Sequence, residues 1–192
     1  MVIRGYKTYF VKMENTENNP WTILEDQLRY ENPWIAVTEY KVINPSGKPG
    51  IYGKVHFKNK AIGIVPIDAE GFIWLVGQWR FPLSCWSWEI PEGGGPLNVD
   101  PLDSAKRELL EEAGVEAARW ELLVRSFLSN SVSDEEAIIY LARDITKREV
   151  NREETEADMK IMRIHFKEAI LMMDQGKITD SLTVMGLLAA AR

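Results

Sequence analysis

The stretch PEGGGPLNVDPLDSAKRELLEEAGV, residues Pro91 to Val115, decides the fold. Three consecutive glycines precede a run whose apolar residues recur at three- and four-residue spacing, namely Leu102, Ala105, Leu109 and Ala113. This spacing predicts a helix that buries one stripe of its surface. Asp100 suits the N-cap, Pro101 the first turn, and Gly114 the left-handed residue that ends a helix. The stretch therefore predicts a glycine-rich loop that leads into an amphipathic helix.

The same helix carries three acidic residues, Glu108, Glu111 and Glu112, at positions i, i+3 and i+4. Residues with this spacing lie on one face, so their carboxylates would repel one another. One interpretation is a solvated Glu-rich face, because Glu is a good helix former. The other is a site for a divalent cation, since carboxylate oxygens are the ligands that Mg²⁺ and Mn²⁺ prefer. Arg107 can also pair with Glu111 or with Asp103.

Strand patterns flank this helix. Residues 34–43 (WIAVTEYKVI) alternate apolar and polar side chains, the turn-rich NPSGKPG follows, and IYGKVHF resumes a strand pattern. Together they predict a β-hairpin module. The remaining candidate elements are strands at 61–67, 72–76, 86–90, 122–128 and 137–142, and helices at 167–175 and 181–191. Strands that alternate with helices predict an α/β fold.

The chain has 192 residues, 45% of them hydrophobic, and a net charge of −6. The acidic balance argues against a protein that binds nucleic acid through charge. No apolar run approaches the roughly 18 residues of a membrane span, and residues 1–20 lack a signal-peptide pattern. Cys85 is the only cysteine, so no intrachain disulfide is possible, and its apolar surroundings predict a buried thiol. These features predict a cytoplasmic protein.

Several of these segments resemble a known family. Gly93, Arg107-Glu108-Leu109, Glu111-Glu112 and Gly114-Val115 resemble the signature of the Nudix hydrolases, with Val99 at the place of the first signature Glu. Four further segments resemble the branch that acts on ADP-ribose and nucleoside diphosphate sugars: VGQWRFP at 76–82, WEIPEGG at 88–94, SNSVSDEE at 129–136 and GKITDSLT at 176–183. The resemblance covers residues 34–188.

The resemblance implies an α/β/α sandwich around a mixed sheet, with an N-terminal β-hairpin module that helps to form a homodimer. It divides the chain into that module, residues 1–58, and a Nudix hydrolase domain, residues 59–192. The implied activity is hydrolysis of the pyrophosphate bond of nucleoside diphosphate sugars of the ADP-ribose or GDP-mannose type. The products would be a nucleoside monophosphate and a sugar phosphate.

The resemblance also implies ligands for a metal ion. Glu108, Glu111 and Glu112 would hold Mg²⁺, or alternatively Mn²⁺, helped by the backbone carbonyl of Glu92. The glycine loop, Gly94 included, would bring backbone close to the metal and the phosphates, and glycine tolerates the positive φ that such turns need.

Because Val99 replaces an acid that supports the signature arginine or an additional metal, we expect Asp103 to pair with Arg107 instead.

Further roles follow from the same resemblance. Glu135 is the first candidate for the general base and Glu136 the second, with an exposed acidic turn as the alternative for both. Besides its role as a metal ligand, Glu112 is a candidate catalytic residue together with Glu135. Arg80 would contact a phosphate, for which its guanidinium fork is suited, or form a structural ion pair with Glu89.

Trp34 and Trp21 are candidates for stacking on the base, across the dimer. The rival function is a catalytically weakened Nudix module that binds nucleotide sugars as a regulator, for which Val99 is the support. A third function, removal of RNA caps, predicts a basic surface, and the net charge of −6 argues against it. The missing Pro in Ser129-Asn130-Ser131 favours a broad nucleotide-sugar hydrolase over a strict ADP-ribose enzyme.

Overall fold

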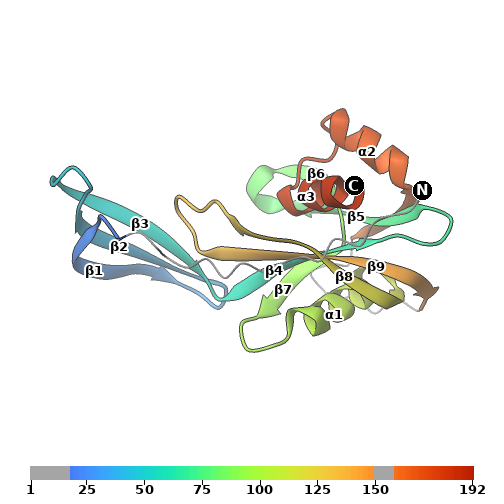
Figure 1. Cartoon of the computed structure of the whole chain (residues 1–192), viewed down its shortest axis with the longest axis horizontal. Coiled ribbons are helices and arrows are strands. Elements are labelled where there is room, and N and C mark those ends of the chain that lie inside the picture. The colour runs from blue at the N-terminus through green and yellow to red at the C-terminus, as the bar shows by residue number, and fades with distance from the viewer. Residues whose placement is uncertain (1–17, 149–157) are drawn as a thin grey trace.

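The computed structural model describes residues 18–148 and 158–192. The strands are β1 (Thr22–Glu31), β2 (Ile35–Ile43), β3 (Pro49–Phe57), β4 (Asn59–Pro66), β5 (Phe72–Arg80), β6 (Cys85–Glu89), β7 (Glu92–Pro96), β8 (Val115–Leu128), β9 (Glu135–Lys147) and β10 (Lys160–His165). The helices are α1 (Pro101–Ala113), α2 (Phe166–Asp174) and α3 (Ser181–Ala190), and a 3₁₀ turn at Phe81–Leu83 joins β5 to β6. The predicted α/β class is confirmed (Figure 1).

The N-terminal strands form a sheet of their own in the order β1-β2-β3, which projects from the rest of the protein at the left of Figure 1. The predicted hairpin is confirmed, since β2 and β3 pair antiparallel along their whole length. Its turn is closed by Asn44, whose side-chain oxygen accepts backbone amide hydrogens from Ser46 and Lys48, and by Gly47 at φ 78°. Beyond the predicted hairpin, β1 adds a third strand that is exposed along its length.

The body of the protein is built around a mixed sheet in the order β7-β4-β9-β8, in which β4 and β9 run parallel. Figure 1 shows α1 below this sheet and α3 above it. Because side chains alternate along a strand, Ile62 and Ile138 pack with Leu109 of α1. Ile139, the next residue of β9, packs with Leu187 of α3 on the other face. The layers are therefore helix, sheet and helix, as the sequence predicts.

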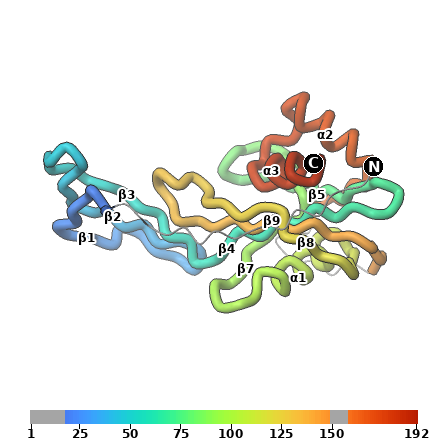
Figure 2. Tube along the Cα trace, viewed as in Figure 1, coloured from blue at the N-terminus to red at the C-terminus, as the bar shows by residue number. Residues whose placement is uncertain are grey.

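A second sheet, in the order β10-β5-β6, packs against α2. The tube in Figure 2 shows how the chain leaves β10, runs through α2 and turns back into α3. This return brings Asp180, which precedes α3, within 4.8 Å of Glu89 at the end of β6. In the part of the chain that the structure describes, no helix has the length and apolar character that a membrane crossing requires.

Cys85 is exposed, so the prediction of a buried thiol is wrong. The reason is its position in the second sheet. It begins β6, which is an edge strand, and it directly follows the exposed turn at Phe81–Leu83. Apolar neighbours in the sequence therefore do not bury it.

Asp134, in the turn between β8 and β9, ties the N-terminal sheet to the body. Its Oδ2 lies 2.8 Å from both Lys54 Nζ and His56 Nδ1, and its Oδ1 accepts the amide hydrogen of Phe57 at 3.0 Å. Burial alone would raise the pKa of Asp134, but the hydrogen bonds from Lys54, His56 and Phe57 outweigh it and lower the pKa to about 2. One carboxylate thus connects β3 to the β8–β9 turn.

We expect Asp134→Asn to lower the stability of the chain at pH 7 by about 0.5–1.5 kcal/mol. The amide keeps the contact with Phe57 but loses the charge that faces Lys54 and His56. A depressed pKa in the folded state stabilises the fold above the unfolded value of about 3.9, and this contribution is lost as the pH falls toward about 2. Urea unfolding should therefore show a difference between wild type and variant that shrinks in acid.

Asp26→Asn, on exposed β1, is the control and should be nearly neutral at every pH. A difference between wild type and Asp134→Asn that stayed constant from pH 7 to about pH 3 would contradict the role given to the Asp134 charge.

Candidate functional site

Helix α1 begins and ends where the sequence predicts. Asp100 caps it by accepting the amide hydrogen of Leu102 at 2.8 Å, and Gly114 ends it in the left-handed conformation at φ 64°. Ala105 and Leu109 are fully buried and anchor the helix on the sheet. Because α1 is fixed at both ends and along its buried stripe, its acidic side chains have defined positions.

Two of the three acidic side chains are buried between α1 and β7. Glu108 is 5% exposed and Glu112 2% exposed, and Glu112 Oε2 accepts the amide hydrogen of Glu92 at 2.8 Å. Glu111 lies on the more open side, with 29% of its side chain exposed. The interpretation of a solvated acidic face is therefore wrong for Glu108 and Glu112, because both lie in the interface between helix and strand.

Gly93–Gly95 lie within strand β7, which pairs with β4, so the prediction of a glycine loop is wrong. None of the three adopts a positive φ. The glycines instead leave space for neighbouring side chains. A Cβ on Gly93 would overlap the Glu108 carboxylate, and a Cβ on Gly95 would lie 2.8 Å from the Ile62 side chain. The strand can approach α1 this closely only because its inner face carries no side chains.

Arg107 supplies the positive charge beside this cluster. Its guanidinium donates to Glu111 and to Glu108 at 2.6 Å each, and to the carbonyl oxygen of Gly94 at 3.1 Å. Burial would lower the pKa of Arg107, but the charges of Glu108 and Glu111 raise it. The arginine therefore stays charged and joins helix α1 to strand β7.

Val99 lies exposed in the connection between β7 and α1. Asp103, the expected substitute for the missing acid, pairs with Lys106 at 3.2 Å and not with Arg107. The expectation is therefore wrong. Arg107 extends toward β7 and finds its partners there, whereas Asp103 and Lys106 form their own pair on the exposed side of the helix.

The three carboxylates of α1 do not meet at one point. Within residues 18–148 and 158–192, the acidic side chains that bring one oxygen each to within 4.8 Å of one another are Glu89, Glu92 and Asp180. Because Gly93 faces Glu108 of α1 and side chains alternate along a strand, the Glu92 side chain of this second cluster lies on the other face of β7 from α1. Glu92 connects the two clusters, because its backbone amide contacts Glu112 while its side chain contacts Arg80.

Arg80, at the end of β5, forms the ion pair that the sequence left as one of two alternatives. Its Nε lies 2.9 and 3.0 Å from the two carboxylate oxygens of Glu89, and its terminal nitrogen lies 2.5 Å from Glu89 and 2.6 Å from Glu92. Burial would lower the pKa of Arg80, but the hydrogen bond with Glu89 and the charge of Glu92 raise it. Arg80 is therefore held charged at the junction of β5, β6 and β7.

Asp180 is a member of the second cluster that sequence reasoning missed. It caps α3 by accepting the amide hydrogen of Thr183 at 2.7 Å. Burial, and then the charges of Asp180 and Glu89, raise the pKa of Glu92 well above its usual value. An Asp before the run Ser181-Leu182-Thr183 is a recognisable N-cap. Only the packing of α3 reveals that this N-cap faces Glu92.

Glu135 and Glu136 begin β9, the neighbour of β4 in the mixed sheet. Ile138 packs toward α1, so strand alternation places Glu136 on the α1 face and Glu135 on the α3 face. Glu136 pairs with Arg125 and lies 3.8 Å from Lys60. Glu135 is half-buried, and burial raises its pKa. The structure therefore puts Glu135 and the α1 carboxylates on different faces of the sheet.

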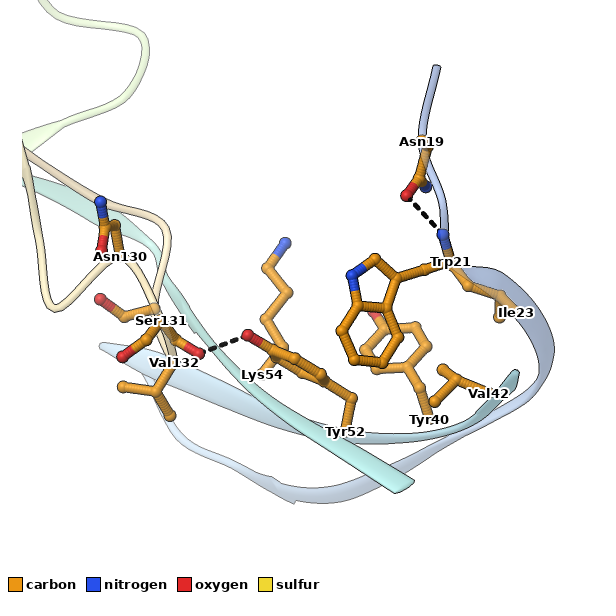
Figure 3. A pocket seen from close by; sticks show the side chains of 11 residues that line it. Asn19, Trp21, Ile23, Tyr40, Val42, Tyr52, Lys54, Asn130, Ser131 and Val132 are labelled. Carbon is orange, nitrogen blue, oxygen red and sulfur yellow. Dashed lines mark hydrogen bonds between the residues drawn. The ribbon is translucent and has the colours of Figure 1, made fainter. Parts of the chain in front are cut away.

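A cavity of about 450 Å³ lies between the N-terminal sheet and the β8–β9 turn. Figure 3 shows Trp21 and Tyr52 on one wall and Ser131 on the other. The rings of Trp21 and Tyr52 meet edge to face with centroids 5.3 Å apart, and the Tyr52 hydroxyl donates to the carbonyl oxygen of Ser131. The cavity thus offers an aromatic wall to a ligand.

Trp34 does not line this cavity. It is 64% exposed and precedes β2, at the opposite end of β1 from Trp21. Ten strand residues span roughly 30 Å. Within one chain, Trp21 and Trp34 therefore belong to different surfaces and cannot stack on the same base.

The NUDIX domain family matches residues 57–179. The ADP-ribose pyrophosphatase of Mycobacterium tuberculosis is 36% identical over 67% of this chain and 63% of its own length, so the chain spans less than two thirds of that relative. The methanol dehydrogenase activator of Bacillus methanolicus is 32% identical over 66% of this chain and 69% of that protein. The ADP-ribose pyrophosphatase of Bacillus subtilis is 27% identical over the same shares.

Among solved structures, an ADP compounds hydrolase superposes with a TM-score of 0.81, covering 91% of this chain and 94% of that chain at 16% identity. At this identity the likeness concerns the fold alone, and it confirms the predicted sandwich. The family match includes β4, β7, α1 and the whole mixed sheet. Since this match covers well over half of the sequence, the chain belongs to the Nudix family.

Proposed function

We propose that this chain is a pyrophosphohydrolase that cleaves the pyrophosphate bond of nucleoside diphosphate sugars of the ADP-ribose or GDP-mannose type. The products would be a nucleoside monophosphate and a sugar phosphate. The observation that carries the proposal is the pair of buried carboxylates, Glu108 and Glu112, held against the backbone of β7. Two relatives named ADP-ribose pyrophosphatase, at 36% and 27% identity, support the same substrate class.

The donors proposed for this site, carboxylate oxygens and a backbone carbonyl, are of the types that Mg²⁺ and Mn²⁺ prefer. Glu108, Glu111 and Glu112 would hold the ion with the carbonyl of Glu92. When bound, such an ion neutralises pyrophosphate charge and lowers the pKa of a coordinated water.

The protein's own residues would fix the geometry. The Glu92 amide orients Glu112, and Arg107 orients Glu108. The backbone of Gly94, which Arg107 contacts, would approach the phosphates. Arg80 is already charged and could exchange its bond with Glu92 for a phosphate oxygen.

Glu135 remains our first proposal for the general base and Glu136 the second. A carboxyl whose pKa is raised by burial lies closer to the working pH of a base, and Glu135 has such a shift. Glu136 already forms ion pairs with Arg125 and Lys60, which occupy its carboxylate.

The N-terminal module, which we assign to residues 1–58 beside a hydrolase domain at 59–192, would bind the base end of the substrate. Trp21 supports this through its aromatic cavity, and Trp34 through its exposure. We propose a homodimer, because β1 exposes apolar side chains, Ile23 and Leu24 among them. A monomeric mass by light scattering at micromolar concentration would contradict the dimer. A cytoplasmic location remains part of the proposal.

The test is a substrate panel of ADP-ribose, GDP-mannose and UDP-glucose with Mg²⁺ in excess. We expect release of the nucleoside monophosphate from at least one of them, detected by chromatography, and no release when the metal is chelated. Absence of turnover with every member of the panel, at micromolar enzyme, would defeat the proposed activity.

A regulatory module that binds nucleotide sugars without turnover is the second candidate. The observation that favours it is the relative named methanol dehydrogenase activator, at 32% identity. Tight binding of a nucleotide sugar without product in the same panel would support this candidate over the hydrolase.

A further inference from the structure

A second acidic cluster lies outside the carboxylates of α1. Glu89 ends β6, Glu92 begins β7, and Asp180 caps α3, so three separate elements each contribute one carboxylate. One oxygen from each lies within 4.8 Å of the other two. Glu89 and Glu92 are strand residues and Asp180 is fixed as the N-cap of α3, so the fold brings the three carboxylates together.

The positive charge in the cluster is too small for its three carboxylates. Within residues 18–148 and 158–192, Arg80 is the cation that pairs with the cluster, and its guanidinium is committed to both oxygens of Glu89 and to Oε1 of Glu92. Asp180 uses one oxygen, Oδ2, for the amide and hydroxyl of Thr183. Three carboxylates against one guanidinium leave an excess of negative charge in a partly buried place, which is unfavourable unless another cation balances it.

One carboxylate oxygen of the cluster lacks a hydrogen-bond donor. Glu92 Oε2 is buried, and no residue in the described ranges donates a hydrogen bond to it. A buried acceptor without a donor is unfavourable, and more so when it carries charge. Such atoms are rare in folded proteins and call for a partner, such as a ligand, an ion, a water or a proton on the carboxyl group itself.

There is space for that partner. A cavity of about 250 Å³ is lined by Glu89, Glu92 and Asp180, together with Arg80 and the side of Ser87. A water occupies about 30 Å³ in the liquid, so the cavity can hold a cation with several of its waters. Mg²⁺ and Mn²⁺ are commonly bound in this way, by a few carboxylates and retained water.

We propose that Glu89, Glu92 and Asp180 form a divalent-cation site that is separate from the carboxylates of α1. Glu92 connects the two, because its amide contacts Glu112 on the α1 side while its side chain faces the cavity on the α3 side. Cation binding here needs no nucleotide and no hydrolysis, so the proposal does not rest on the proposed activity.

The experiment measures binding of Mn²⁺ alone to the full chain by electron paramagnetic resonance, without nucleotide. The background is the double variant Glu108→Gln, Glu112→Gln, which removes two charges from α1 and leaves the second cluster intact. We expect this variant to keep one bound Mn²⁺. Adding Asp180→Asn should raise its dissociation constant at least about tenfold. Asparagine is as good an N-cap as aspartate, so α3 should stay capped.

Two further variants serve as a control and as an independent test. Asp100→Asn makes the same chemical change at the N-cap of α1, away from the cavity, and should leave Mn²⁺ affinity unchanged. Glu92→Gln changes a second ligand and should weaken binding to a similar extent as Asp180→Asn. Circular dichroism and thermal unfolding of each variant check that the fold persists.

The proposal is overturned if the double variant binds no Mn²⁺, which would mean that Glu92 carries a proton in place of a metal partner. It is also overturned if Asp180→Asn and Glu92→Gln leave the affinity unchanged. A chain that hydrolyses no nucleotide sugar but loses Mn²⁺ in these variants would refute the proposed activity and support the second site.

Discussion

Glu112→Gln is expected to lower kcat for ADP-ribose hydrolysis by about 10³-fold. Glutamine has nearly the same size and can still accept the Glu92 amide hydrogen, so the contact between α1 and β7 should persist. The variant loses the negative charge that would hold a divalent cation. Initial rates at saturating ADP-ribose and Mg²⁺ measure the effect.

Glu121→Gln is the matched control, because it makes the same change on an exposed position of β8 and should leave the rate within about twofold of wild type. If Glu112→Gln retained a rate similar to that of the control, Glu112 would not be a metal ligand, and the reaction would have to be assigned to other carboxylates. A melting temperature close to that of wild type is required for either conclusion.

Gly93→Ala is expected to destabilise the chain by about 1–3 kcal/mol. The added methyl group would overlap the buried Glu108 carboxylate, so either β7 or Glu108 must move. Urea unfolding at neutral pH gives the change in free energy. We also expect lower hydrolytic activity, since the displaced Glu108 belongs to the proposed metal site.

The neighbouring substitution Gly94→Ala is the control for stability. A Cβ there lies 3.4 Å from the Asn59 amide nitrogen, which is an ordinary contact. Its cost should stay within about 0.5 kcal/mol, because alanine also restricts the unfolded chain. A loss for Gly93→Ala as small as that for Gly94→Ala would show that β7 tolerates side chains on both faces, contrary to the packing described above.

The parts of the fold that the sequence predicts are those set by local patterns. Helix α1 has its cap, its apolar stripe and its terminal glycine within one short run, and all three take the predicted positions. The β2–β3 hairpin depends equally on local features, namely alternation and a turn with Asn44 and Gly47. Such elements need no knowledge of distant residues.

The glycines of β7 show where local reasoning stops. A triplet of glycines carries no hydrophobic pattern and is typical of turns, so a loop was the natural prediction. The structure makes it a strand because α1 lies directly against it and Glu108 occupies the space in front of Gly93. The requirement comes from a residue fifteen positions away and is invisible in the run itself.

In the candidate site, too, some features follow from local sequence patterns and others depend on the tertiary fold. The grouping of Glu108, Glu111 and Glu112 follows from helical spacing, but which of them are buried depends on β7. Asp180 lies far along the chain from Glu92, so their approach depends on the tertiary fold alone. The separation of Trp21 from Trp34 follows from the length of β1, once that strand is known.

A single residue, Lys58, separates the end of β3 at Phe57 from the start of β4 at Asn59. Its ammonium group lies 2.7 Å from both Glu31 Oε1 and the carbonyl oxygen of Asn32, which pins it to the β1–β2 turn. We therefore expect the projecting sheet to keep a fixed orientation relative to the body of the protein. Binding of a partner to the tip of this sheet would therefore cost little orientational entropy. A force that the partner exerts on the tip would be transmitted to β4, the strand that pairs with the glycine backbone of β7.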